Sequence, residues 1–121
     1  MAEDLSNVRL SSHATAVAET LYNTGYFDDR VAIAKLGFAY AISNYYKKFN
    51  PSEIEGTLDS AGINYNVGTL DSDKSIAELV CSLYPETLTP YRLTRAIICY
   101  GLDKLGERND RGELFPLYEM M

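Results

Sequence analysis

The sequence predicts a mainly helical fold. Apolar residues recur at helical spacing in four separate stretches, whereas the alternation typical of a strand is confined to a few positions. Hydrophobic residues make up 46% of the chain, too many for an intrinsically disordered protein. At 121 residues the natural expectation is a single domain, 1–121, that is large enough to bury a sizeable core.

A short strand and a helix are expected first. Residues 7–10 alternate polar and apolar side chains, so Val8 and Leu10 should face inward. Ser11, or the serine after it, is a good N-cap for the helix that follows, whose apolar residues fall at i, i+3, i+4, i+7 and i+8. Gly25 is a suitable residue for the end of this segment.

A second helix is predicted from Asp28 or Asp29 to about Tyr46. Either aspartate can cap the helix and suits the positive end of its dipole. The segment 31–42 is apolar nearly all round, so it must be covered on most of its sides. Small residues that would allow another helix to approach closely lie along this segment: Ala34, Gly37 and Ala41.

An irregular excursion is expected over residues 51–72. Asn50 followed by Pro51 breaks the preceding helix, because the residue before a proline avoids the helical region. Within the excursion we expect one short strand over residues 63–67. The strand-helix-helix unit is therefore assigned to residues 7–46.

Two further helices are predicted within residues 73–106, followed by a tail over residues 107–121. Candidate caps for the first of these helices are Ser72, Asp73 and Ser75. Thr89 is expected to cap the second, with Pro90 at its first position and Gly106 at its end. The tail is charged and then apolar, so it either docks on the body or frays.

The charge is unevenly distributed along the chain. The net charge is −6, and residues 51–91 alone carry one basic and seven acidic side chains. The longest apolar run, residues 36–42, is far shorter than the ~20 residues that a membrane helix needs. The acidic start has no apolar signal segment behind it, and the two cysteines lack metal-binding spacing. We therefore expect a cytoplasmic protein without membrane association.

Residues suited to catalysis do not form a recognisable pattern. His13 is the only histidine, and we interpret it as an exposed residue without a triad partner. The start of a calcium loop at residues 71–75 fails, because Ile76 occupies the required glycine position and Ser82 that of the bidentate glutamate. The sequence therefore predicts a protein that is not an enzyme and has no metal or cofactor.

The order strand, helix, turn, helix over residues 7–42 resembles the ribbon-helix-helix fold. In that fold two chains pair their short strands and interlock their helices. The association would supply a partner for the strand and cover for the segment 31–42. A homo-oligomer, dimer or tetramer, is the expectation, and its interface would contain Val8, Leu10, Ala34, Gly37, Phe38 and Ala41.

Within that group the chain is similar to the DNA sulfur-modification protein DndE family. Three segments carry the likeness in the same order: Val8-Arg9-Leu10-Ser11 with Ile33-Ala34-Lys35-Leu36-Gly37-Phe38-Ala39, then Tyr65-Asn66-Val67-Gly68-Thr69-Leu70, then Leu93-Thr94-Arg95-Ala96-Ile97. The resemblance implies a non-enzymatic DNA-binding accessory subunit of a phosphorothioation system. Its implied partners are duplex DNA, intact or nicked, and the other subunits of that system.

The polar strand face in this fold would consist of Asn7, Arg9 and Ser11, which would point into the major groove. The second helix, which usually receives a phosphate at its start, instead begins with the acidic pair Asp28 and Asp29. Candidate DNA-binding residues are Arg9, Arg30, Lys35, Lys47, Lys48, Arg92 and Arg95.

Three other functions remain open from the sequence. The acidic middle could face a basic partner in a protein-interaction or adaptor module. A ribbon-helix-helix transcriptional regulator would share the DNA-binding mode. An enzyme of an unrecognised class would require a deep pocket that gathers His13 with carboxylates.

Overall fold

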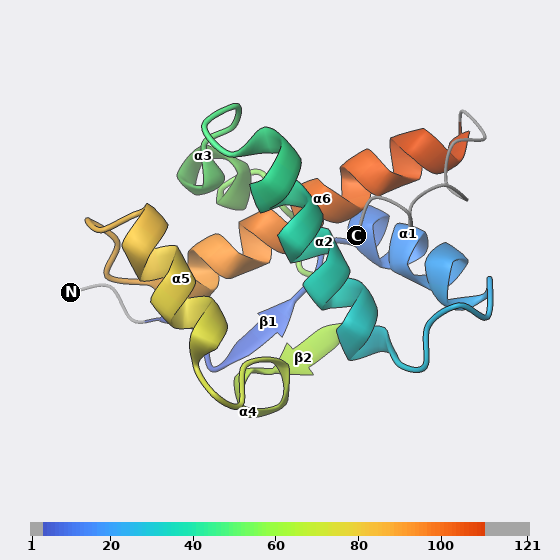
Figure 1. Cartoon of the computed structure of the whole chain (residues 1–121), viewed down its shortest axis with the longest axis horizontal. Helices are drawn as coiled ribbons and strands as arrows, with labels where there is room; N and C mark the ends of the chain where they lie inside the picture. Colours follow the sequence, from blue (N-terminus) through green and yellow to red (C-terminus); the bar gives the residue numbers. More distant parts are fainter. Residues whose placement is uncertain (1–3, 111–121) are drawn as a thin grey trace.

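The computed structural model describes residues 4–110, and Figure 1 shows helices packed around one long helix beside a small sheet. The elements are β1 (Asn7–Arg9), α1 (Ser12–Tyr22), α2 (Arg30–Tyr45), α3 (Pro51–Glu55), β2 (Asn64–Asn66), α4 (Val67–Leu70), α5 (Ser75–Leu83) and α6 (Pro90–Asp110). The long helix α6 packs against α1, α2, α3 and α5, and also against β1. The mainly helical fold class is therefore confirmed, with α6 as the element around which the core forms.

The sheet consists of β1 and β2, which pair antiparallel within the one chain. Val8 lies opposite Tyr65, and both side chains are buried. Beyond the strands, the Leu10 N–H donates to the Ile63 carbonyl at 2.8 Å, which extends the pairing by one step. Both predicted strands are present, and each is the other's partner (Figure 1).

The starts of α1 and α2 agree with the sequence predictions. The Ser11 hydroxyl accepts from the Ala14 N–H, and the Asp29 carboxylate accepts from the Ala32 N–H. Gly25 lies beyond the end of α1 with φ +82°, a conformation that glycine adopts without strain. Local capping chemistry therefore fixes where both helices begin.

The apolar helix α2 is covered by its own chain. Figure 1 shows α2 crossing α6, and the two helices form the most extensive contact in the molecule. The side chains of Ile33, Phe38 and Ala41 are all at most 5% exposed. The chain therefore shields the segment 31–42 without a second copy, and the packing argument for association no longer holds.

The predicted excursion over residues 51–72 contains two short helices that the sequence analysis missed. The Asn50 side chain caps α3 by accepting from the Ser52 N–H, and Pro51 occupies the first turn. The Asn66 side chain caps α4 in the same way through the Gly68 N–H at 2.8 Å. These caps support helical turns that are too short to show apolar periodicity.

Helix α6 begins at Pro90 as predicted, but two carboxylates that were not among the predicted caps accept hydrogen bonds at the starts of α5 and α6. Asp71 accepts from the N–H groups of Ile76 and Ala77, and Lys74 at the N-cap position has φ 62°. At α6 the carboxylate of Asp4 accepts from the N–H groups of residues 91 and 92. Helix α6 also continues past Gly106 to Asp110, because a glycine in mid-helix lowers helix propensity without ending the helix.

Candidate nucleic-acid interface

The two-stranded sheet has one buried and one exposed face. Because side chains alternate along a strand, Val8 and Tyr65 point inward, and the residues on either side of them point outward. The Tyr65 hydroxyl donates to the Arg30 carbonyl at 3.0 Å, and burial raises the pKa of this phenol to about 12. This inward anchor fixes the sheet against the start of α2.

The outward face consists of Asn7, Arg9, Asn64 and Asn66, all of them exposed. In register, Asn7 lies opposite Asn66, and Arg9 lies opposite Asn64. We name these residues the ribbon face. Asparagine and arginine side chains can form paired hydrogen bonds with the edges of adenine and guanine, respectively, in the major groove.

Two of these side chains already make intramolecular bonds. The Arg9 Nη1 donates to the Gly62 carbonyl at 3.0 Å. The Asn66 oxygen accepts from the Gly68 N–H at 2.8 Å, so its NH₂ group is not used by the cap. Both side chains are therefore oriented while retaining further hydrogen-bond donors.

One residue of the predicted polar strand face, Ser11, lies elsewhere in the structure. Ser11 is buried, at 3% exposure, and its hydroxyl caps α1, so it does not lie on the ribbon face with Asn7 and Arg9. Its place is taken by Asn64 and Asn66, which the sequence analysis did not select. The signal was available, because alternation along the predicted strand 63–67 puts both asparagines on one side.

Arg95 is a second correction, because it lies in the protein interior. Its side chain is 5% exposed and donates from Nε to the Arg9 carbonyl at 2.6 Å. It also binds the Asp59 carbonyl, the Ser60 hydroxyl at 3.1 Å and the Glu55 carboxylate at 3.3 Å. A guanidinium with these partners joins β1 to the segment after α3 and is not available to DNA.

Arg30 and Arg92 face carboxylates. The Arg30 guanidinium binds Glu19 through Nε at 2.7 Å and lies 4.2 Å from the centre of the Tyr22 ring. Arg92 Nη1 lies 3.9 Å from the Glu55 carboxylate. Their positive charges are thus partly balanced within the chain.

The predicted lysines are exposed but do not share one place. Lys35 lies within α2. Two hydrogen bonds from Ser75 are the main cause of the lowered pKa of Asp73, and the charge of Lys35 adds to the shift. Lys47 and Lys48 follow the other end of α2, which at 16 residues is ~24 Å long. The predicted DNA-binding residues therefore do not form one continuous patch on a single chain.

The predicted oligomer interface lies in the core of the single chain. Val8 and Leu10 are fully buried because β1 pairs with β2, and Phe38 is 5% exposed because α6 covers α2. The small residues of this set are buried as well: Ala34, Gly37 and Ala41. A second copy is not needed to cover any of them.

The acidic middle of the chain is largely engaged in intramolecular bonds. Asp59 accepts from the Ser12 N–H, and Asp71 caps α5 and accepts from the Tyr91 hydroxyl at 2.8 Å. Glu55 faces the two arginines described above, and Asp73 accepts from the Ser75 N–H. The negative charge of this segment therefore serves helix capping and internal ion pairs.

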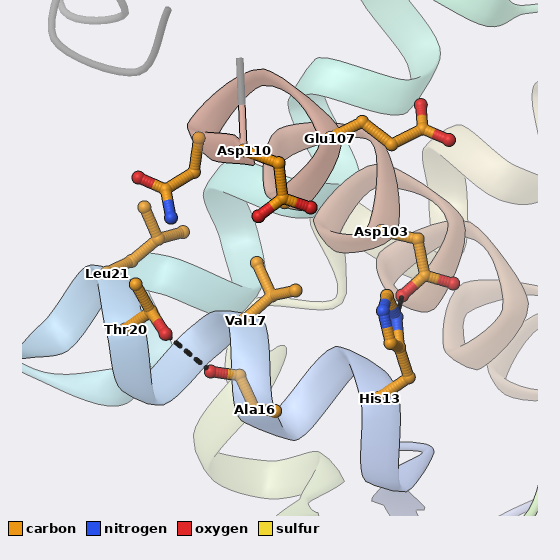
Figure 2. A pocket seen from close by; sticks show the side chains of 10 residues that line it. His13, Ala16, Val17, Thr20, Leu21, Asp103, Glu107 and Asp110 are labelled. Carbon is orange, nitrogen blue, oxygen red and sulfur yellow. Dashed lines mark hydrogen bonds and ion pairs between the residues drawn. The ribbon is translucent and has the colours of Figure 1, made fainter. Parts of the chain in front are cut away.

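A groove between α1 and α6 gathers His13 with carboxylates (Figure 2). It measures about 420 Å³, and Val17 lies on its floor between His13 and the end of α6. The His13 Nδ1 lies 2.6 Å from Asp103 Oδ1. This hydrogen bond and the charge of Asp103 raise the pKa of the imidazole above 6.5.

The His13–Asp103 pair has the form of an oriented general base, but a base needs a nucleophile or substrate proton within reach. Among the described residues that line this groove, only Thr20 carries a hydroxyl, and it donates to the Ala16 carbonyl at 3.0 Å (Figure 2). The pair is 71% and 37% exposed at its two side chains. This exposed pair links α1 to α6.

Metal-ligand clusters of three or more His, Cys, Asp or Glu residues do not occur within residues 4–110. In the same range no helix combines the length and apolarity required to cross a membrane. Comparison with protein-family models, curated proteins and solved structures finds no match to this chain.

Proposed function

We propose that this chain is a non-enzymatic DNA-binding accessory protein that contacts duplex DNA through the ribbon face. The observation that carries the proposal is the cross-strand pairing of Asn7 with Asn66 and of Arg9 with Asn64 on an exposed two-stranded ribbon. The resemblance to the DndE family supplies the context: a subunit that accompanies the enzymes of a DNA phosphorothioation system.

The dimensions of a two-stranded ribbon suit the major groove. That groove is about 12 Å wide and admits a pair of strands, whose outward side chains then meet the base edges. Arg9 would pair with O6 and N7 of a guanine, and Asn64 beside it would pair with N6 and N7 of an adenine. One chain is enough to form this ribbon, because β1 pairs with β2 of the same chain.

Each chain contributes a single arginine to the ribbon face, so the affinity of one copy should be low. We therefore propose that two or more copies, or a copy with other subunits of the system, act together. Linking two weak contacts raises the overall affinity without a new contact at either site. The surfaces that join the copies would differ from the core residues assigned from sequence.

The acidic adaptor is the weaker candidate, because the acidic middle is engaged in caps and ion pairs. A transcriptional regulator would use the same ribbon face. It differs in that it would prefer one operator sequence strongly over unrelated duplexes.

The proposal is tested by fluorescence anisotropy of a labelled duplex at two salt concentrations. Replacing Arg9→Ala together with Asn64→Ala should weaken binding about tenfold or more, because paired base contacts are lost. Lys35→Ala removes one exposed positive charge outside the ribbon face and is the matched control, with a small expected effect. Light scattering of the free and bound protein gives the number of copies.

Two results would contradict the proposal. One is a duplex affinity that falls equally for the ribbon variant and for Lys35→Ala, since charge alone would then account for it. The other is the absence of any duplex binding at low salt by a folded protein at micromolar concentration.

A further inference from the structure

We propose that a second surface, at the end of α2 and along α6, binds an unpaired stretch of nucleic acid. Its rings are Tyr45, Phe49 and Tyr100, and its cations are Lys48, Lys104 and Arg108. We name these residues the aromatic–cation cluster. The proposal goes beyond the ribbon face, because neither its residues nor its ligand are those of the duplex contact.

The rings of the cluster form one continuous group. Phe49 and Tyr100 are stacked, with centroids 4.1 Å apart and planes 5° apart. Tyr45 meets Tyr100 edge to face at 5.5 Å. All three side chains are half-buried, so the group is held in place by packing and still contributes to the surface. Such fixed rings are what unpaired bases stack on.

Cationic side chains lie on the same two segments of the chain as these rings. The Lys104 Nζ lies 5.6 Å from the Tyr45 centroid and 5.5 Å from the Tyr100 centroid. Lys48 is exposed and directly precedes Phe49. One turn beyond Lys104, the Arg108 Nη1 donates to the Tyr40 hydroxyl at 3.4 Å, and its Nε is buried without a hydrogen-bond partner among the described residues.

The cluster brings three cations together in a chain whose net charge is −6. Among the described residues near these rings, the Glu107 carboxylate forms an ion pair with Lys104 at 3.4 Å. Asp103, which directly precedes Lys104, is paired with His13. Lys48 and Arg108 therefore add positive charge beside the Lys104–Glu107 pair. A polyanion is the partner that such a surface favours.

The combination of rings and cations selects a single strand. In a duplex the bases are stacked on each other and cannot reach a protein ring, whereas unpaired bases can stack on the side chains while phosphates meet the cations. An acidic peptide would satisfy the cations but offers few flat faces for the rings. The cluster is also separate from the ribbon, because Lys104 lies nine residues along α6, or ~13 Å, from the β1 contact at Arg95.

The test uses the full chain and fluorescence anisotropy of labelled oligothymidylate, oligouridylate and an abasic strand of equal length. Oligothymidylate should bind with strong salt dependence, and the abasic strand at least about fivefold more weakly, because it lacks bases to stack. Lys48→Ala with Lys104→Ala should reduce the salt slope by about 1.4, since two phosphate contacts are lost. Comparison of the thymidine and uridine strands shows whether DNA or RNA is preferred.

The matched control is Lys35→Ala with Lys74→Asn, which removes the same charge from exposed positions outside both proposed surfaces, asparagine being chosen because Lys74 has φ 62°. It should leave oligothymidylate binding within about twofold, whereas the ribbon variant, Arg9→Ala with Asn64→Ala, should weaken duplex binding. Failure of the duplex experiment with success here would remove the ribbon proposal and leave this one intact. The opposite pattern would remove this one alone.

Three outcomes would overturn the inference. These are equal losses for the cluster and control variants, equal affinity for the abasic and thymidine strands, and tighter binding of polyglutamate than of any oligonucleotide. Tyr45→Leu serves as a second variant that removes a ring and keeps the charge. Circular dichroism and thermal melting confirm that each variant remains folded.

Discussion

Gly37 and Gly101 face each other where α2 crosses α6. A Cβ atom built on Gly101 would lie 1.8 Å from the Gly37 carbonyl oxygen, and one built on Gly37 would lie 2.8 Å from Leu102 Cγ. The absence of both side chains lets the two backbones touch. This contact brings the apolar helix α2 onto α6, and it explains why the single chain covers the segment 31–42.

The first prediction concerns this crossing. Gly101→Ala should destabilise the fold by about 3 kcal/mol or more, because the backbone atoms it meets cannot move aside without separating the helices. Gly37→Ala should cost less, about 1–3 kcal/mol, since its closest contact is the Leu102 side chain rather than the backbone. Urea unfolding followed by circular dichroism measures both.

Gly56→Ala is the matched control for the crossing. A Cβ there would meet only the Glu53 carbonyl oxygen at an ordinary 3.7 Å, and its φ of −68° suits alanine. The Gly56→Ala variant should be as stable as the wild-type protein or slightly more stable. Equal stability of the Gly101 and Gly56 variants would refute the close helix contact.

The second prediction concerns Arg95. Arg95→Ala should destabilise the protein by about 3 kcal/mol, because it leaves the Glu55 carboxylate and the carbonyls of Arg9 and Asp59 without their buried donor. Arg95→Lys should recover only part of this loss, since one ammonium group cannot reproduce the planar set of donors. Thermal and urea unfolding provide the measurement.

Arg30→Ala is the control for Arg95, because its ion pair with Glu19 lies at the surface. Its effect on stability should be small. If instead Arg95→Ala weakened DNA binding and left stability unchanged, the side chain would lie at the surface, as the sequence analysis assumed.

The starts of the first two helices could be predicted, because capping is decided by neighbouring residues. Ser11 and Asp29 bond to N–H groups three positions further on, within the reach of local sequence analysis. The cap of α6 could not be found this way. Asp4 lies 87 residues from Tyr91, and only the folded chain brings the two together.

The strand that pairs with β1 could not be predicted from the sequence for the same reason. Both strands were predicted, but the polar and apolar alternation does not state whether a strand pairs with its own chain or with another. The contact between Gly37 and another helix was predicted and is confirmed, whereas the identity of that helix was not. The stripe of small residues therefore marks a close helix contact inside one chain. The resemblance to an interlocked dimer had placed this contact between two chains.

The candidate site divides along similar lines. The polar positions Asn7 and Arg9 could be selected from the alternation of the strand, and they lie on the ribbon face. Arg95 could not be excluded, because an exposed and a buried arginine look the same in a sequence. Its burial depends on the segment around Asp59, which approaches it only after folding.

The third prediction concerns the pH dependence of the His13–Asp103 link. Because the folded state raises the pKa of His13 above 6.5, the link stabilises the protein fully below that value and less as the pH rises through the folded-state pKa. The imidazole is 71% exposed, so the effect on stability should be small. His13→Gln should remove this part of the pH dependence.

The pKa itself is measured most directly by NMR, since the chain contains one histidine. Asp103→Asn should lower the pKa of His13, because the hydrogen bond and the negative charge are the main causes of its shift. Asp28→Asn, a charge change at the exposed turn before α2, should leave it in place. A His13 pKa at or below 6.5 in the native protein would show that the link does not form.

The fourth prediction concerns the two cysteines. Cys81 is exposed on α5, whereas Cys99 is fully buried in α6, where burial raises the pKa of its thiol. One thiol per chain should therefore react rapidly with a disulfide reagent such as DTNB in the native protein. The second should react about a thousandfold more slowly, because it must wait for local or global unfolding.

Cys81→Ser should abolish the rapid phase and leave the slow one, and in urea the wild-type chain should show two equally reactive thiols. Two rapid thiols in the native protein would mean that α6 is not buried against α1 and α2 as described.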